Sequence, residues 1–333
     1  MGKSINTANP ILQGLLRLTK QREFVLLLVI VIGFIVVSFI TPAFMTEINM
    51  RAMSLGFSLT AMISIGMAVV LISGGFDLSV GSTYGLTGSV IALLFNRHGF
   101  PIWGAAGIGI ATGTGFGFLN GFVIGKLGVN PLITTLSTMI MARGLAMFLT
   151  EGRIVTTRGV GTGFPFLGQG LIYGLPFMFV VFIVLMIVFI FIFKKSVWMR
   201  NVFYTGSSAK AAEYSGINTK KIKVSVYVLC GLIAAVCGMI SLSRFGVAVP
   251  SAGDGIEITA IAACAIGGTS LQGGEGSVPG AVLGVLLLSF LSNMLVLIGT
   301  SVYLQNLVSG IILLLVVTAD HYNKKRLEAT TIA

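Results

Sequence analysis

The stretch "ISGGFDLSVGS", residues 72–82, places a carboxylate, Asp77, between two long apolar runs. One run covers residues 54–73 and the other covers residues 78–95, so the glycines and serines of this stretch interrupt an otherwise apolar part of the chain. Such an interruption is typical of a surface loop, of an ion-binding site, or of a break between membrane helices where something polar must pass. The remainder of the sequence narrows this choice.

The composition is that of an integral membrane protein. Of the 333 residues, 55% are hydrophobic and only 9% are charged, and the mean hydropathy is +1.00. A soluble domain carries about 25% charged residues, whereas an apolar helix of roughly 20 residues crosses a bilayer. We therefore predict an all-α, polytopic membrane protein, one transmembrane domain over residues 1–333 with about ten helices, some of them short or broken. The predicted spans are residues 24–41, 54–73, 78–95, 101–125, 131–150, 175–193, 224–243, 256–268, 277–299 and 302–319.

The positive charges predict the orientation of these spans. The net charge is +11, and fifteen of the 21 Lys and Arg residues share one side of the membrane, against five on the other. Because cytoplasmic loops are enriched in Lys and Arg, we expect both termini in the cytoplasm, with a tail at residues 1–23, a loop at 194–223 and a tail at 320–333. The basic residues are not interleaved with exposed aromatic residues, so nucleic acid is not an expected partner.

No motif for catalysis, nucleotide binding or metal binding is found. A phosphate-binding loop needs a lysine within its glycine frame, and "GGTSLQGGEGS", residues 267–277, contains none. The two histidines, His98 and His321, are far apart, and the three cysteines lie in apolar segments without CxxC spacing, as small buried hydrophobic residues do. We therefore predict no catalytic residues, no metal and no cofactor, and any enzymatic step must come from another chain.

Two helix breaks remain as the polar features of the spans. Gly74 and Gly75 end the apolar run before Asp77, and the run from residue 256 stops after about 13 residues at Gly267 and Gly268, which is too short to cross a bilayer. Each break is followed by a serine that can cap a new helix. Interrupted helices often mark the substrate path of a transporter, so the pair of breaks favours transport over scaffolding.

Two charged residues near these breaks have open roles. Asp77 is either a helix cap, whose carboxylate accepts backbone N–H groups, or part of the permeation path or of the motion that opens it, because carboxylates within a membrane are costly and seldom idle. Arg143 lies well inside its span. Like Asp77, it either takes part in permeation or has a structural role, in which its long side chain reaches outward to the interface or satisfies the carbonyl groups of a broken helix.

Small residues recur at every fourth position of one span. Gly113, Gly117, Gly121 and Gly125 lie on one face of the helix predicted for residues 101–125. Such spacing lets a neighbouring backbone approach closely, so it predicts a helix-packing ridge rather than a ligand loop. Gly280 and Gly284 show the same pattern more weakly.

Three separated motifs carry a family resemblance. "GGFDLSVGS" (74–82), "AKAAEYSGINTKKIKVSVYVLCGLIAAVCGMI" (209–240) and "EITAIAACAIGGTSLQGGEGS" (257–277) resemble, in this order, the membrane subunits of ribose-type bacterial ATP-binding-cassette sugar importers. The similarity extends from about residue 24 to residue 320 and includes "NPLITTLSTMIMARGLAMFLTEG" (130–152). It implies a fold similar to that of the vitamin B12-type importers and a location in the bacterial inner membrane.

The resemblance also implies partners and a docking segment. The expected partners are cytoplasmic ATPases, a periplasmic sugar-binding protein, an identical or sister permease, and membrane lipid. The segment of Ala211, Ala212, Glu213, Gly216 and Ile217 looks like the coupling helix that docks on the ATPase. Many importers have a glutamate before the two alanines, where this chain has Lys210, so the docking contacts are expected to differ from theirs.

The predicted function is import of a monosaccharide or related polyol, driven by partner ATPases. A neutral substrate is favoured because the spans contain few charges. The alternatives are an ion-coupled symporter that uses Asp77 as its cation or proton site, and a membrane scaffold without transport. The residues expected to line the substrate path are Asp77, Ser79, Asn120, Asn130, Thr134, Ser137 and Asn293.

Overall fold

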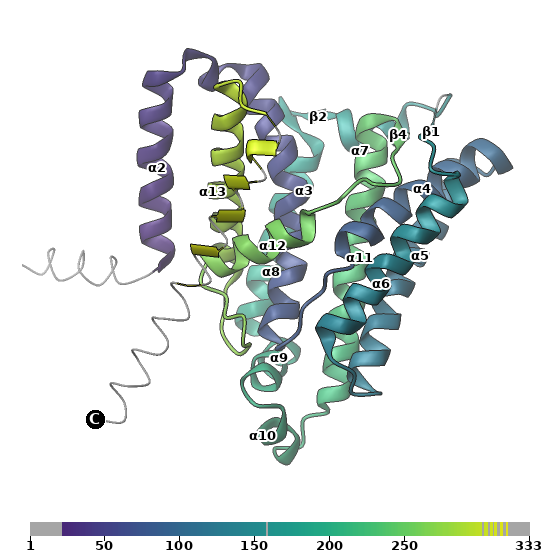
Figure 1. The fold of residues 1–333 in the computed structure, drawn as a ribbon, viewed down its shortest axis with the longest axis vertical. Helices are drawn as coiled ribbons and strands as arrows, with labels where there is room; N and C mark the ends of the chain where they lie inside the picture. The colour runs from purple at the N-terminus through teal and green to yellow at the C-terminus, as the bar shows by residue number, and fades with distance from the viewer. Residues whose placement is uncertain are drawn as a thin grey trace, which may run out of the picture.

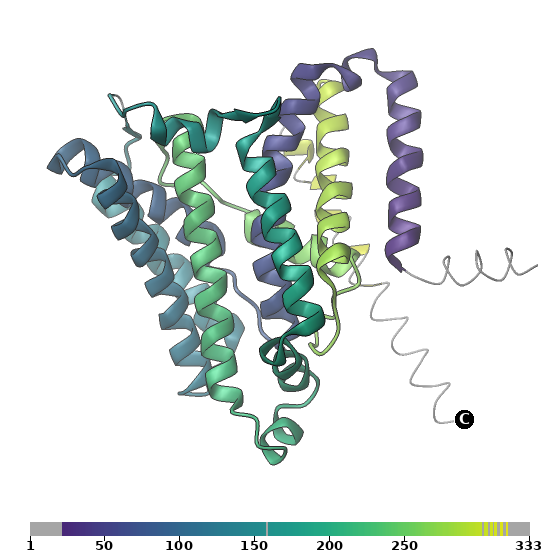
Figure 2. The same ribbon diagram turned by 180° about the vertical axis from the view of Figure 1, so that it is seen from behind.

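The computed structural model describes residues 22–157 and 159–301 and, beyond them, residues 303–305, 307, 308, 310, 311, 314, 315 and 318. Over these residues the chain forms one helical bundle (Figures 1 and 2). Its helices are α2 (Arg22–Ile40), the short η1 (Pro42–Met45), α3 (Glu47–Ile72), α4 (Val80–His98), α5 (Ile102–Gly125), α6 (Pro131–Thr150), α7 (Gly163–Gln169), α8 (Phe177–Lys195), α9 (Val197–Ser207), α10 (Ala209–Tyr214), α11 (Thr219–Phe245), α12 (Ile256–Ile266) and α13 (Val278–Leu297).

Strand structure is limited to two antiparallel ladders in the described part. β1 (Val155–Thr156) pairs with β4 (Val247–Ala248), and β2 (Leu171–Ile172) pairs with β3 (Leu175–Pro176). Both ladders lie at the upper end of the bundle in Figure 1, opposite to α9 and α10. The end that carries α9 and α10 is called the α10 end below.

Seven of the described helices are long and apolar enough to cross a membrane, namely α2, α3, α5, α6, α8, α11 and α13. Together with α4 and α12 they correspond to nine of the ten predicted spans. The tenth, residues 302–319, is only partly described, and its described residues 303–305, 307, 308, 310, 311, 314, 315 and 318 are helical. The predicted tails, 1–23 and 320–333, lie outside the described residues except for Arg22 and Glu23.

The two remaining helices, α4 and α12, differ from the long apolar spans. α4 carries glycines and hydroxyl groups in its first half, and every residue from Val80 to Ser89 is buried. α12 has only 11 residues. Figure 1 shows that α4 and α12 both begin inside the bundle rather than at one of its ends, so each is preceded by a non-helical segment within protein. This is the environment in which irregular backbone is tolerated at membrane depth.

The glycine ridge predicted on α5 is confirmed. Gly113, Gly117, Gly121 and Gly125 are all buried. A Cβ atom at Gly121 would lie 2.8 Å from the Cα atom of Val224, and one at Gly117 would lie 3.0 Å from that of Gly231, so α5 and α11 are in backbone contact. The weaker pair on α13, Gly280 and Gly284, faces the carbonyl groups of Gly267, which follows α12, and of Ala263 within α12.

The core is centred on α3. Every residue of α3 from Ala61 to Ile72 is buried, and its side chains pack with those of α8, α11, α12 and α13 in one apolar cluster. α2 lies at the edge of the bundle (Figure 1) and exposes most of its apolar surface, as expected of a helix that faces lipid. The polar residues described next are therefore surrounded by apolar helices.

Candidate functional site

The segment from Ser73 to Ser79 joins the end of α3 to the start of α4 inside the bundle. The side chain of Asp77 is 1% exposed, and its Oδ1 atom accepts hydrogen bonds from the backbone N–H (2.9 Å) and the hydroxyl group (2.6 Å) of Ser79. The first bond is of the kind that the helix-cap interpretation predicts. Ser79 occupies the N-cap position of α4 but makes no side-chain cap bond; its hydroxyl group donates to Asp77, and its oxygen accepts from another helix.

A chain of hydrogen bonds continues from Ser79 to two other helices. Asn120 of α5 donates from Nδ2 to the Ser79 hydroxyl (2.8 Å) and accepts at Oδ1 from the hydroxyl of Thr138 on α6 (2.7 Å). All four side chains are at most 4% exposed. Each unsatisfied polar group in a membrane interior costs several kcal/mol, so the bonds of this Asp77–Ser79–Asn120–Thr138 network hold the helix break against α5 and α6.

A further contact holds the same segment against α11. The hydroxyl group of Tyr227 donates to the backbone carbonyl of Phe76 (3.0 Å), and Tyr227 is fully buried. A Cβ atom at Gly75 would overlap the Tyr227 hydroxyl oxygen, so this close approach requires glycine at position 75. The break is therefore hydrogen-bonded directly to α5 and α11, and through Asn120 to α6.

The second break, residues 267–277, meets the first at the α10 end. The backbone N–H of Gly274 donates to the carbonyl of Ile72, the last residue of α3 (2.9 Å). A Cβ atom at Gly206, near the end of α9, would overlap that same carbonyl oxygen and would lie 2.7 Å from the Gly274 nitrogen. Three backbone segments, the end of α3, the second break and α9, are therefore in direct contact at one point.

The residues predicted for coupling lie together beyond α9. α10 is capped by Ser208, whose hydroxyl accepts from the Ala211 N–H (3.3 Å), and it is closed by Gly216 with φ of +81°. The N–H of Ile217 donates to the carbonyl of the buried Ala212 (3.0 Å), and Glu213 accepts from the Thr219 hydroxyl (2.5 Å). A hollow of about 380 Å³ between α9 and α10 is lined in part by Tyr204, Ala211, Ala212 and Ile217.

The other predicted path residues do not all join the network. Asn130 caps α6 by accepting from the N–H of Leu132 (2.9 Å), and Thr134 is buried on the α6 face that also carries Thr138. Ser137 lies on the exposed face of α6, and its hydroxyl donates to the carbonyl of Ile133 in its own helix.

Asn293 lies elsewhere, between α13 and α3. It exchanges two hydrogen bonds with Asn49, of 2.8 and 3.1 Å. It also lines a cavity of about 410 Å³, whose wall carries further polar side chains from α3, α12 and α13. These are Thr60, Thr259, Ser289 and Ser292.

The structure also places charged residues around the start of α12. Arg143 of α6 donates from Nη1 to the carbonyls of Pro250 (2.6 Å) and Ala252 (2.9 Å) and forms an ion pair with Asp254 (2.6 Å). The side chain of Arg143 therefore binds carbonyl groups of the non-helical segment that precedes α12, and its part in transport stays untested. Glu257, in the first turn of α12, is 8% exposed and its Oε2 atom has no hydrogen-bond partner in the described part of the chain.

Sequence reasoning missed Thr138 and Glu257. Thr138 was detectable, because it follows Thr134 by four positions and so shares its helix face, whereas Ser137 is turned away. Glu257 gave no comparable signal, since a carboxylate at the start of a helix is ordinary. Only the packing of α12 against α4 reveals that it is buried.

Comparison with known proteins decides the family. Residues 49–317 match the family described as the permease component of branched-chain amino acid transport systems. The chain belongs to this permease family. It is also 37% identical over 267 residues to the ribose import permease protein RbsC of Haemophilus influenzae, which covers 80% of this chain and 82% of the relative.

Two further relatives of this permease are similar over most of their length. The L-arabinose transport system permease protein AraH of Escherichia coli is 35% identical over 303 residues, 91% of this chain and 92% of that protein. RbsC of Bacillus subtilis is 35% identical over 263 residues, 79% of this chain and 81% of the relative. No solved structure matches the chain.

Proposed function

We propose that this permease is the membrane subunit of an ATP-binding-cassette importer for a monosaccharide such as a pentose. The observation that carries the proposal is the similarity, over about 80 to 90% of the chain, to permeases named for ribose and L-arabinose. The family description names branched-chain amino acids, but the three relatives compared above are named for sugars. The cavity beside Asn293 agrees with a neutral polyol, because hydroxyl and amide groups rather than charges provide its polarity.

The partners follow from the same assignment. Cytoplasmic ATPases would dock at α10, a periplasmic sugar-binding protein would deliver substrate at the opposite end, and a second permease, identical or related, would complete the pore. The exposed apolar face of α6, which carries Ser137, Ile140 and Met141, is our choice for the surface that faces the second permease. This arrangement has ten spans, a vitamin B12-type importer fold, and both termini on the cytoplasmic side of a bacterial inner membrane.

Two roles are proposed for the predicted path residues. The Asp77–Ser79–Asn120–Thr138 network positions the start of α4, with Asn130 and Thr134 fixing the part of α6 beside it. Asn293 and its hydroxyl neighbours in the cavity contact the sugar. Substituting Asn293 by Ala would then raise the KM for sugar, whereas changes in the network would lower the amount of folded permease.

Uptake in a reconstituted system tests the function. The permease, its ATPase and its binding protein in proteoliposomes should accumulate labelled ribose or L-arabinose only with ATP inside, and should not accumulate leucine. Uptake that follows a sodium or proton gradient without the ATPase would instead support an ion-coupled symporter. Accumulation of leucine but of neither sugar would overturn the substrate assignment.

The docking site has its own test. Ala212→Arg places a long cation at a buried position of α10, and it should uncouple ATP hydrolysis from sugar uptake in folded complex. Tyr214→Arg, at an exposed position of α10 that does not line the hollow, is a nearby comparison that should have a smaller effect. Unchanged coupling in Ala212→Arg would contradict docking at α10.

A further inference from the structure

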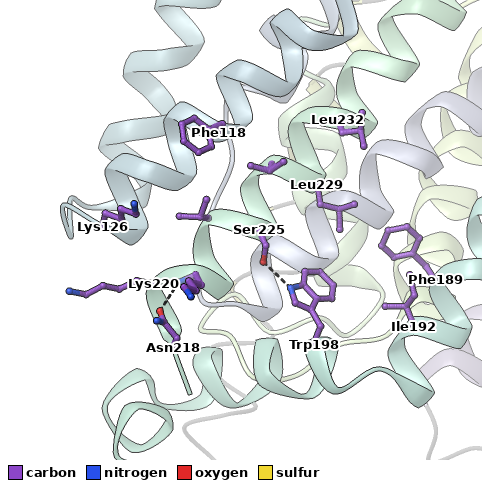
Figure 3. Close-up of a pocket in the computed structure, with 13 residues that line it drawn as sticks. Phe118, Lys126, Phe189, Ile192, Trp198, Asn218, Lys220, Ser225, Leu229 and Leu232 are labelled. Atoms are coloured by element: carbon purple, nitrogen blue, oxygen red, sulfur yellow. Dashed lines mark hydrogen bonds between the residues drawn. The ribbon is translucent and has the colours of Figure 1, made fainter. Parts of the chain in front are cut away.

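A large groove lies between α5, α8, α9 and α11, close to the α10 end (Figure 3). Its volume is about 900 Å³, and its wall is mostly apolar. Phe118 of α5, Phe189 of α8 and Leu229 and Leu232 of α11 contribute large apolar side chains to it. Neither the substrate path nor the coupling residues account for this groove.

The groove is apolar at one end and basic at the other. In Figure 3, Phe118 and Leu232 lie at the top of the view, while Lys126, Lys220 and Asn218 lie below them. Lys221, which follows Lys220 in the chain, also lines the groove. Phe189, Ile192 and Trp198 lie about as low in the view as Lys220, so the lysines form one side of the lower part, which is the part nearer to α10 and is called the basic end below.

The lysines at the basic end lack an acidic partner. All three side chains, Lys126, Lys220 and Lys221, belong to exposed residues, and no ion pair in the described part of the chain involves them. Three positive charges therefore surround one end of an apolar groove without compensation. An anion at this position would be attracted by all three.

The floor of the groove is fixed in shape. The indole N–H of Trp198 on α9 donates to the hydroxyl of Ser225 on α11 (2.8 Å), so the aromatic ring is held across the junction of the two helices (Figure 3). The apolar wall is open, since Phe118 is 54% exposed. Apolar surface next to a cluster of lysines matches a molecule that has a long apolar part and an anionic head.

We propose that this groove binds an anionic phospholipid, with acyl chains along Phe118, Leu229 and Leu232 and the phosphate group among Lys126, Lys220 and Lys221. Basic pockets between membrane helices on the cytoplasmic side select anionic head groups. A second copy of this chain fits less well, because a two-fold contact centred on the groove would bring the same lysines together. This inference rests on the proposed function in one respect: the proposed function gives the orientation in which the α10 end lies in the cytoplasmic leaflet.

Fluorescence of Trp198 tests the proposal directly. The chain has two tryptophans, so the Trp103→Phe variant contains a single tryptophan, Trp198, in the floor of the groove. The permease is reconstituted in vesicles of phosphatidylcholine with increasing fractions of brominated phosphatidylglycerol, and separately with brominated phosphatidylcholine. We expect the anionic lipid to quench Trp198 at a several-fold lower mole fraction than the zwitterionic lipid.

Paired lysine variants separate a specific site from general attraction to the membrane surface. Lys126→Gln with Lys220→Gln should remove most of the preference, since each lysine near the surface contributes about fivefold in binding. Lys194→Gln with Lys195→Gln removes the same charge from the end of α8, outside the groove lining, and should keep the preference.

Three results would overturn the proposal. The first is equal quenching of Trp198 by the two lipids, and the second is a preference for the anionic lipid that survives Lys126→Gln with Lys220→Gln. The third is absence of quenching by either lipid, which is expected if another protein covers the groove. The measurement needs neither sugar nor ATP. Its failure therefore leaves the transport assignment in place, and failure of sugar uptake would not affect this result.

Discussion

The two helix breaks have the same sequence form and different structures. Each has a glycine pair, one acidic residue and a following serine. In the first break, Asp77 is buried and bonded to Ser79, whose hydroxyl group is part of a network that reaches α6. In the second, Glu275 is exposed, and Ser277 caps α13 by accepting from the N–H of Gly280 (3.0 Å).

The difference lies in the neighbours of each break. The first is surrounded by α5, α6 and α11, which supply Asn120, Thr138 and Tyr227. The second turns at the α10 end, where Gly268, Gly273 and Gly274 adopt positive φ angles of +88°, +92° and +77°. Glycine pairs thus predict that a helix stops, while surrounding polar groups determine whether the acid that follows is buried.

The largest effect is expected where the second break and α9 meet the end of α3. Gly206→Ala would force a methyl group onto the carbonyl oxygen of Ile72, and backbone cannot yield as a flexible side chain can. We expect the free energy of unfolding to fall by at least about 3 kcal/mol, the upper range for overpacking, as measured by thermal unfolding in detergent. Sugar uptake should be lost as well, as measured by a transport assay. Gly115→Ala, which meets nothing within 4 Å, should leave stability within about 0.5 kcal/mol.

Asp77→Ala and Glu275→Ala compare the two acids directly. The first removes the acceptor of the buried Ser79 N–H, and it should cost about 1 to 3 kcal/mol, the cost of one unsatisfied buried group, because the Ser79 hydroxyl can turn to another acceptor while the N–H cannot. The second removes an exposed carboxylate, and it should change stability by less than about 0.5 kcal/mol. Thermal unfolding of both variants checks this.

Asp77→Asn then separates charge from hydrogen bonding. An amide oxygen can still accept from Ser79, so we expect most of the stability to return. Normal uptake by this variant would show that the charge is dispensable for transport. Equal losses of stability for Asp77→Ala and Glu275→Ala would contradict the contrast between the breaks.

The serine of the second break should make a moderate contribution to the stability of the fold. Ser277→Ala removes the cap of α13 and a bond from Ser277 to Glu23 of α2, so it should cost about 1 kcal/mol, as loss of a cap does. Ser277→Thr keeps a hydroxyl at the N-cap and should recover most of it. Full stability of Ser277→Ala in thermal unfolding would show that the cap bond is unimportant here.

The smallest effect is expected from the hydrogen bond between Thr138 and Asn120. Hydrogen bonds between membrane helices average about 0.6 kcal/mol in double-mutant cycles, and we expect a coupling energy of that size from Thr138→Val, Asn120→Leu and the double variant. Ser137→Ala is the adjacent control, because Ser137 bonds only within its own helix. A larger loss of stability in Ser137→Ala than in Thr138→Val would reverse the assignment of the two faces of α6.

Much of the fold follows from local properties of the sequence. Nine predicted spans correspond to described helices because each is a long apolar run or a run bounded by glycines, and a bilayer admits few alternatives to a helix. The α5 ridge was predictable for a similar reason, since four glycines at helical spacing define a face whatever it packs against. Asp77, Ser79 and Asn120 were selected as polar groups in apolar surroundings, and the fold brings them together.

The sequence by itself therefore determined the class of protein, the helices, the breaks and the family resemblance. Only the tertiary structure decided that α4 and α12 begin inside the bundle, that Thr138 rather than Ser137 completes the network, and that Asn293 pairs with Asn49 in a separate cavity. The physical reason is that hydropathy and glycine spacing act within one helix. The burial of Asp77 and Glu257 depends instead on side chains and backbone from helices far away in the chain.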